Sequence, residues 1–346
     1  MRVPAFRITA AICLGFASRA HGEPITVGNQ LTLGRASGAT LATERVFVMG
    51  TPSPSWLLRV DGGYARTTHS NRGTYQLAGM AIWMPSDHWS FDMSLALSPP
   101  EKAQTELPVR VTDLDGIECN ATASVAARSW AFSSEIAAEY DAARTGPYSW
   151  TVGTALGSRL IHSVQRLDAV TLEDGPQLTA VTLEQACLQH ECSEATAALL
   201  ARDRTTLIQL NATLTSTFTI HDTKEFDASV AMYVYNETPA SVGLFRLAAQ
   251  GRSDVASTQA LPVMPLRTSV TGGYSQRIRD WTISTFGQYG DYVGALGWNM
   301  QLGVKGKWRI SAPWRLTFGI VAQRDATASM PIAWAGSLTV GGARSF

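Results

Sequence analysis

The sequence is poor in charged residues and contains no long apolar run. Asp, Glu, Lys and Arg make up 16% of its 346 residues, against about a quarter in an ordinary soluble domain. With 45% hydrophobic residues the chain is still too apolar for a disordered protein. No stretch reaches the ~20 apolar residues of a transmembrane helix. The 28 basic and 28 acidic residues leave no basic field, so nucleic acid is excluded as a partner.

The first twenty residues have the three parts of a secretory signal peptide. Two arginines in MRVPAFR precede the short apolar run ITAAICLGF, and small residues follow at Ser18 and Ala20. We therefore expect residues 1–20 to be removed, with the mature chain starting near His21 or Glu23. An exported chain without a transmembrane helix is periplasmic, secreted or an outer-membrane barrel.

Long alternating segments favour the barrel. In PWRLTFGIVAQRD, WNMQLGVKGKWRI and LIQLNATLTSTFTIH, apolar and polar residues alternate over 10–15 positions. This period of two indicates strands with one apolar and one polar face. Soluble strands average 5–6 residues, whereas membrane-crossing strands need about 9–11. A soluble β-sandwich is the alternative, but its strand faces should be neither so long nor so rich in Thr, Gln and Lys.

A repeated sequence motif marks one end of the predicted barrel. It consists of a tight turn, an aromatic residue and a run of alternating apolar and polar residues. Six such motifs and six return segments predict twelve strands, an even number as in bacterial single-chain barrels, with ten or fourteen as the alternatives. The aromatic residues lie at the start of each strand, where an interfacial girdle belongs. They are Trp56, Trp89, Tyr148, Phe226, Trp281 and Trp314.

The sequence therefore predicts an all-β fold, a twelve-stranded antiparallel up-and-down transmembrane β-barrel. Short connections on the aromatic side would be periplasmic turns, and the long connections would be extracellular loops. We expect the barrel to span 52–346, after an N-terminal periplasmic or plug segment at 21–51. The long loops are expected at 99–121, 161–204 and 237–265.

The C-terminal stretch SLTVGGARSF resembles the last strand of Gram-negative outer-membrane β-barrels, which commonly ends in Phe with apolar residues at alternate positions. The resemblance implies that Leu338, Val340 and Phe346 form a signal for the barrel-assembly machinery. Twelve strands after a short N-terminal segment also resemble the translocator domain of autotransporters, in a form without a passenger.

Charges on the polar strand faces are expected to point into the lumen. They would form either a pore-lining field that selects ions or salt bridges that brace a closed barrel. The acidic residues come from earlier strands and the basic residues from the last four. They are Asp61, Asp92 and Asp227, and Arg267, Arg277, Lys305, Lys307, Arg309 and Arg315.

Two short motifs suggest chemistry but fit it poorly. THSNRG resembles the His-x-Ser motif of outer-membrane phospholipase A, but His69 and Ser70 are adjacent and would face opposite sides of a strand. In CLQHEC, Cys187 and Cys192 are expected to form a disulfide in an oxidising compartment, and pairing of one of them with Cys119 is a second possibility. Zinc binding with His190 and Cys119 is the alternative.

Two functions remain after these exclusions. The first is a narrow channel or transport-like barrel, and the second is a non-conducting structural or surface-binding barrel acting through its extracellular loops. A lipid hydrolase is a minor third, so we expect no enzyme activity, no metal and no cofactor. The expected partners are outer-membrane lipids, lipopolysaccharide and the barrel-assembly machinery, and any surface ligand is unknown.

Overall fold

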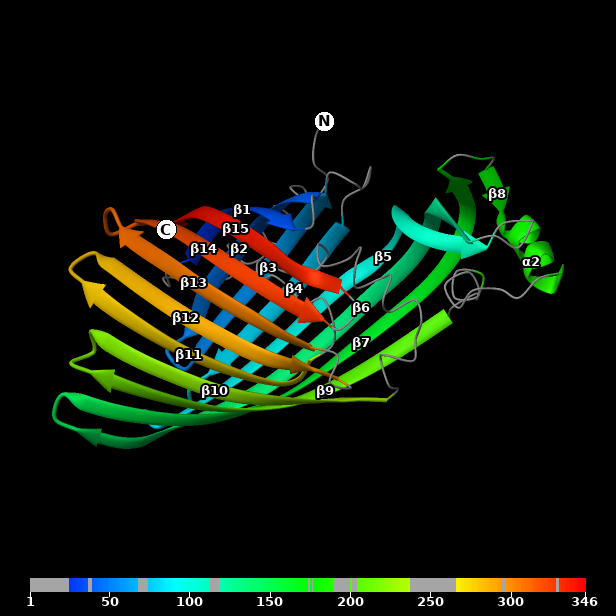
Figure 1. The fold of residues 1–346 in the computed structure, drawn as a ribbon. Helices are drawn as coiled ribbons and strands as arrows, with labels where there is room; N and C mark the ends of the chain where they lie inside the picture. Colours follow the sequence, from blue (N-terminus) through cyan, green and yellow to red (C-terminus); the bar gives the residue numbers. More distant parts are fainter. Residues whose placement is uncertain are drawn as a thin grey trace.

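The computed structural model shows a closed antiparallel β-barrel (Figure 1). It describes residues 25–36, 39–67, 74–112, 118–173, 175, 177–189, 200, 204–236, 266–293, 297–327 and 330–346. Within these ranges, no helix is long and apolar enough to cross a membrane.

Each barrel strand pairs antiparallel with its neighbours in the chain, and pairing of β1 with β15 and of β6 with β7 completes the ring. Short β8 pairs antiparallel with the far end of β7, beyond the stretch that pairs with β9, and is followed by helix α2. The elements are β1 (Ile25–Ala36), β2 (Ala39–Ser53), β3 (Trp56–Thr67), β4 (Thr74–Trp83), β5 (Trp89–Thr112), β6 (Glu118–Thr145), β7 (Tyr148–Leu172), β8 (Gln177–Thr179), α2 (Ala180–Gln189), β9 (Arg204–Ile220), β10 (Lys224–Tyr235), β11 (Leu266–Ile278), β12 (Trp281–Tyr292), β13 (Gly297–Arg309), β14 (Trp314–Thr327) and β15 (Met330–Ser345).

The barrel has fourteen strands, β1–β7 and β9–β15, so the prediction of twelve is wrong. The two additional strands lie in 21–51, which was expected to be a periplasmic or plug segment. Both have mixed faces: Asn29 and Glu44 lie on the outer face and hydrogen-bond each other, while Phe47 lies on the inner face. These exceptions hide the period of two that revealed the other twelve strands.

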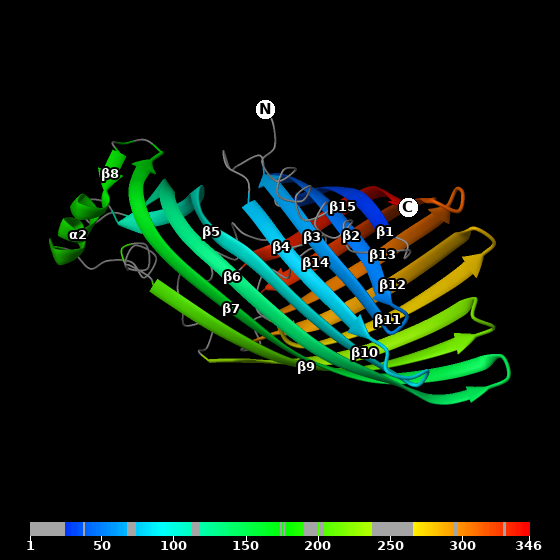
Figure 2. The same cartoon turned by 180° about the vertical axis from the view of Figure 1, so that it is seen from behind.

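The expected loop at 99–121 is mostly strand. β5, β6 and β7 are 24, 28 and 25 residues long and extend beyond the barrel rim (Figures 1 and 2). Pro99 and Pro100 begin the expected loop, but they lie in a register irregularity between Ser98 and Glu101, where a missing N–H donor is tolerated. The loop expected at 161–204 likewise begins only after β7 and includes β8 and α2.

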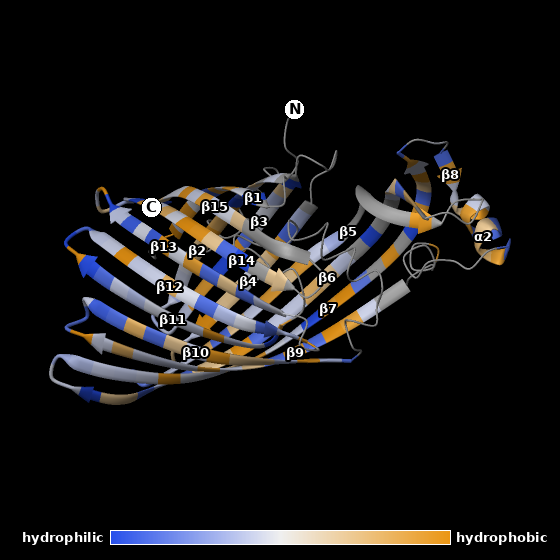
Figure 3. Cartoon of the chain, in the orientation of Figure 1, coloured by the Kyte–Doolittle hydropathy of each residue, from blue (hydrophilic) through white to orange (hydrophobic). Residues whose placement is uncertain are grey.

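Apolar and polar residues alternate along the strands (Figure 3). The outward-facing apolar side chains are exposed, among them Leu156 at 66%, Leu214 at 68% and Ile320 at 60%. Several inward-facing polar ones are buried, such as Asn299 and Gln323. This inverted pattern suits a barrel whose outer wall meets lipid.

Candidate functional site: the charged inner wall

The inner face of the barrel carries charges of both signs. Strand alternation and register place Asp61, Asp92 and Asp227 on this face, as well as Arg277, Lys305, Lys307, Arg309 and Arg315. Arg267 lies apart from them at the far end of β11, next to a register irregularity.

Part of the inner-face charge lies on two opposite walls. In a ring of fourteen strands, β5 and β6 lie seven positions from β13 and β14, that is, diametrically opposite. β13 and β14 form the front wall in Figure 1, and β5 and β6 lie in the front wall of Figure 2. The front wall of Figure 1 is basic and the other is acidic. The basic residues are Lys305, Lys307, Arg309 and Arg315, and the acidic residues are Asp92, Glu135 and Glu139.

Glu135 and Glu139 were not among the lumen charges predicted from the sequence. Their spacing of four puts both on one face of a strand, and this spacing was the signal that could have found them. In the ladder they lie opposite Gly157 and Gly153 of β7. The hydroxyl of Ser90 on β5 donates to Glu139.

Most charges on the opposing walls are exposed, and those of the described residues do not pair across the lumen, whereas Asp92 is partly buried. Lys305, Lys307, Glu135 and Glu139 are all exposed. An ideal fourteen-stranded barrel, with strands about 4.8 Å apart and tilted by about 40°, has a backbone diameter of about 28 Å. Extended Lys and Glu side chains cover about 10 Å of that width together. Direct salt bridges across a circular barrel of this size are therefore too long to form.

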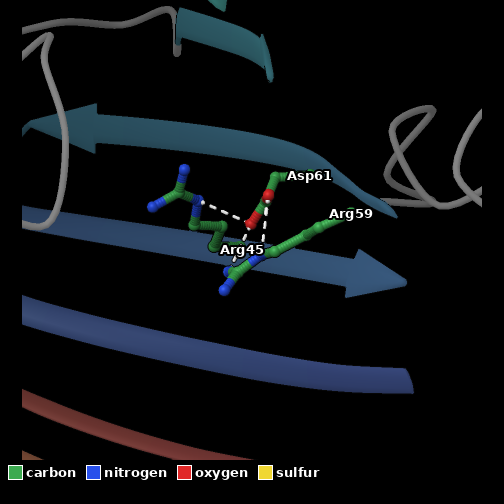
Figure 4. Close-up of polar contacts among 3 residues, drawn as sticks. All are labelled: Arg45, Arg59 and Asp61. Carbon is green, nitrogen blue, oxygen red and sulfur yellow. Dashed lines mark hydrogen bonds and ion pairs between the residues drawn. The ribbon is translucent and has the colours of Figure 1, made fainter. Parts of the chain in front are cut away.

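The ion pairs within the described ranges are formed along the wall or at its rim. Asp61 is buried and accepts contacts from Arg45 at 3.2 Å and Arg59 at 2.6 Å (Figure 4). Arg309 pairs with Asp280 at the turn between β11 and β12, where both side chains are exposed. The bracing contacts thus hold neighbouring strands together on one wall.

Two inner-face phenylalanines lie flat against the wall because each covers a glycine of the adjacent strand. Phe47 packs over Gly28, and Phe286 packs over Gly303. A cation covers each ring: the guanidinium of Arg59 lies 4.4 Å from the Phe47 centroid, and the ammonium of Lys305 lies 4.9 Å from that of Phe286. A ring held flat in this way projects little from the wall.

Aromatic residues surround the outer face at the end with the short turns. All six aromatic residues singled out in the sequence lie there, each at or near the start of its strand. Five of them lie beside a second aromatic ring that was not part of the predicted girdle. The pairs are Trp56–Trp83, Trp89–Tyr140, Tyr148–Phe218, Phe226–Tyr274 and Trp281–Trp308. Trp314 instead contacts Arg344, which also covers the ring of Phe346.

The C-terminal strand is sealed against the N-terminal one. Leu338 and Val340 lie on the outer face opposite Leu33 and Leu31. Phe346 donates its backbone N–H to the carbonyl of Ile25 at 2.8 Å. A role of these residues in assembly stays a prediction.

The two other motifs fall largely outside the described residues. His69, Ser70, His190 and Cys192 all lie outside them. Cys187 lies in α2. The Cys187–Cys192 disulfide therefore stays a prediction.

Beyond the barrel rim, β5–β7 carry a small apolar core of their own. Strand residues Val111, Ala123 and Val170 pack with Leu178 of β8 and Leu183 of α2, and all five are buried. We call this unit the appendage: the outer parts of β5–β7 together with β8 and α2. Its strands were not anticipated, because 99–121 and 161–204 were expected to be loops.

Comparisons with known proteins show the fold alone. No protein-family model matches the chain, and no curated protein does. A FadL homologue from Pseudomonas aeruginosa is similar in structure, with a TM-score of 0.50 and 10% identity over 94% of this chain and 89% of that one. The translocator domain of autotransporter NalP from Neisseria meningitidis gives 0.43 and 11%, over 99% of both chains.

CdiB from Acinetobacter baumannii gives a TM-score of 0.42 and 8% identity, and the 93% of this chain that matches spans 60% of CdiB. The autotransporter resemblance was inferred from twelve strands, whereas this barrel has fourteen. What the described residues and the FadL homologue share is the fold of a closed antiparallel β-barrel.

Proposed function

We propose that the protein is a water-filled channel of the outer membrane that passes small polar solutes. The observation that carries this proposal is the pair of exposed, oppositely charged walls on the inner face. Exposed Lys and Glu side chains need water around them, which a lumen packed with protein would not supply. Eight-stranded barrels are filled by their side chains, whereas sixteen-stranded ones leave an aqueous channel.

The location and partners follow from the same proposal. The exposed apolar outer wall and the aromatic residues at its turn end are suited to outer-membrane lipid, with lipopolysaccharide in the outer leaflet. The barrel-assembly machinery would insert the chain after removal of residues 1–20. Catalysis is not part of the proposal, and no cofactor is invoked.

Ion selectivity of the refolded protein in planar bilayers tests the channel. The wild type should conduct with weak selectivity, because the two walls carry similar numbers of opposite charges. Glu135→Gln with Glu139→Gln should shift the reversal potential in a salt gradient towards anions. Lys305→Gln with Lys307→Gln should shift it towards cations, since a wall stripped of charge no longer concentrates its counterion.

Lys224→Gln is the matched control, because Lys224 lies on the outer face at the turn end of β10. It should leave the reversal potential unchanged. An absence of conductance in wild-type protein that migrates as a folded barrel would contradict the channel. So would equal reversal potentials in all three variants.

The appendage favours a second function, a barrel that binds a ligand at the cell surface. It has its own buried core, and the surface of α2 carries exposed Val181 and Leu188. An ordered unit outside the membrane is suited to contact another molecule. The two functions are compatible, since the appendage lies beside the barrel mouth (Figure 1).

A further inference from the structure

We propose that the inner wall of β7, β9 and β10 holds a binding site for a small organic carboxylate, centred on Arg159. The ligand would be one of the solutes that the channel passes. The inference rests on the proposed function only for the route by which the ligand arrives.

Three polar side chains lie side by side on this wall. Arg159 of β7 is directly opposite Gln209 of β9, which is directly opposite Tyr235 of β10. Residues paired in this way share one face of the sheet and have Cβ atoms about 5 Å apart. Leu156 and Leu210, in the alternate positions, are exposed on the outer face, so the row faces inward.

A second amide completes the row. Asn211 lies opposite Gly157, and its side chain occupies the space where a Cβ of residue 157 would be. It therefore leans towards β7, beside Arg159. The guanidinium of Arg159 and the amides of Gln209 and Asn211 together provide N–H donors on one small area of the wall.

The aromatic part of the site is held in place by hydrogen bonds. The hydroxyl of Tyr235 donates to the carbonyl oxygen of Leu266 at 2.8 Å. The hydroxyls of Tyr233 and Ser269 lie 3.3 Å apart. Both tyrosines come from β10 and are partly buried. Their rings thus form a fixed apolar surface next to the donors.

Arg159 has no ion-pair partner within the described ranges, where the three ion pairs involve other arginines. The nearest inner-face carboxylate by register is Glu135 of β6, which lies diagonal to Arg159 and is exposed. Arg159 itself is partly buried and desolvated, with Tyr235 as its electrostatic neighbour. A desolvated cation without a counterion favours binding of an anion.

The chemistry of the donors favours a carboxylate over other anions. A guanidinium donates two parallel hydrogen bonds that match the two oxygens of a planar carboxylate. One arginine balances one negative charge, whereas phosphate carries nearly two at neutral pH. The adjacent tyrosine rings would accept the apolar part of an organic acid.

Equilibrium binding measured on the full chain in detergent micelles tests the site independently of conduction. Saturation-transfer NMR with butyrate should give saturable binding, and the uncharged isostere butyramide should bind about tenfold more weakly or less, because charge-assisted hydrogen bonds are lost. Arg159→Gln should weaken butyrate binding by about tenfold or more. Glu135→Gln should strengthen it, because a nearby negative charge is removed.

Arg277→Gln is the matched control, since it removes an inner-face arginine at the turn end of β11. It should leave butyrate binding unchanged, and Arg159→Lys, which keeps the charge, covers the case in which Arg159→Gln does not fold. Equal binding of butyrate and butyramide would overturn the site. An equal loss of butyrate binding in Arg159→Gln and Arg277→Gln would mean that the overall positive charge of the lumen, and not a site at Arg159, attracts butyrate. Displacement of butyrate by equimolar phosphate would overturn the carboxylate assignment. Butyrate binding without conductance would contradict the channel and keep the site.

Discussion

The buried ion pairs of Asp61 and the exposed Arg309–Asp280 pair are expected to stabilise the barrel by different amounts. Its carboxylate is buried between β2 and β3 and contacts two arginines. Removing one partner of such a group costs about 3–5 kcal/mol, because the remaining charges are left uncompensated. Arg309 and Asp280 are exposed at a turn, where such pairs contribute about 1 kcal/mol or less.

We therefore expect Asp61→Asn to destabilise the folded barrel by about 3 kcal/mol, since Arg45 and Arg59 would both lose their counterion. Urea unfolding of the protein refolded into lipid vesicles measures the change. Arg309→Gln is the control and should cost about 1 kcal/mol or less. Equal stability of Asp61→Asn and the wild type would show that water already screens the three charges.

At the scale of the element, glycines decide where large inner-face side chains lie. Phe286 occupies the space over Gly303 on the neighbouring strand, and Lys305 covers its other face. A Cβ at residue 303 would push the ring off the wall. Gly272 of β11 lies on the outer face, and the nearest atom to a Cβ there is a backbone oxygen 3.9 Å away.

Gly303→Ala should therefore move Phe286 into the lumen and lower single-channel conductance, whereas Gly272→Ala should leave conductance unchanged. Planar-bilayer recordings of both variants at the same salt concentration measure the difference. A conductance of Gly303→Ala equal to that of wild type would mean that Phe286 finds another position along the wall.

The appendage is an element that should unfold separately from the barrel. Leu183 is fully buried in its core, and an aspartate there would leave a charge without a partner. Leu183→Asp should make 177–189 sensitive to protease while the barrel keeps its heat-modifiable migration. The control is Leu188→Asp, because Leu188 is 87% exposed. Loss of the folded barrel in Leu183→Asp would show that the two units fold together.

At the scale of the whole molecule, the two ends of the barrel differ. One end has tight turns such as 279–280 and 311–313, with Arg279 in the left-handed region. The other end carries the appendage (Figure 1). Short periplasmic turns and larger extracellular structures are typical of outer-membrane barrels.

An epitope tag inserted at 279–280 should therefore be hidden from antibody in intact cells, and a tag placed beside Leu188 in α2 should be accessible. Permeabilised cells are the control, in which both tags should be stained. Labelling of the first tag alone in intact cells would reverse the orientation of the barrel.

Much of the fold could be predicted because apolar and polar residues alternate along each strand of a membrane barrel. Phe318 and Ile320 of β14, and Leu210 and Leu214 of β9, alternate with polar residues. Both strands, and the face on which each of their residues lies, were therefore predicted. β1 and β2 were missed because Asn29 and Glu44 interrupt the outer face and Phe47 occupies the inner one. The Asn29–Glu44 hydrogen bond that satisfies these polar groups exists only after β1 and β2 pair.

The sequence by itself thus determined the fold class and the faces of its most regular strands, because those depend on local alternation. Only the tertiary structure decided which charges share a wall. Glu135 and Lys305 lie on opposite walls because of the order of the fourteen strands around the ring. Arg159, Gln209 and Tyr235 form a row because of the register of three strands. Residues 76 positions apart become neighbours through ladder hydrogen bonds, whose partners local alternation does not specify.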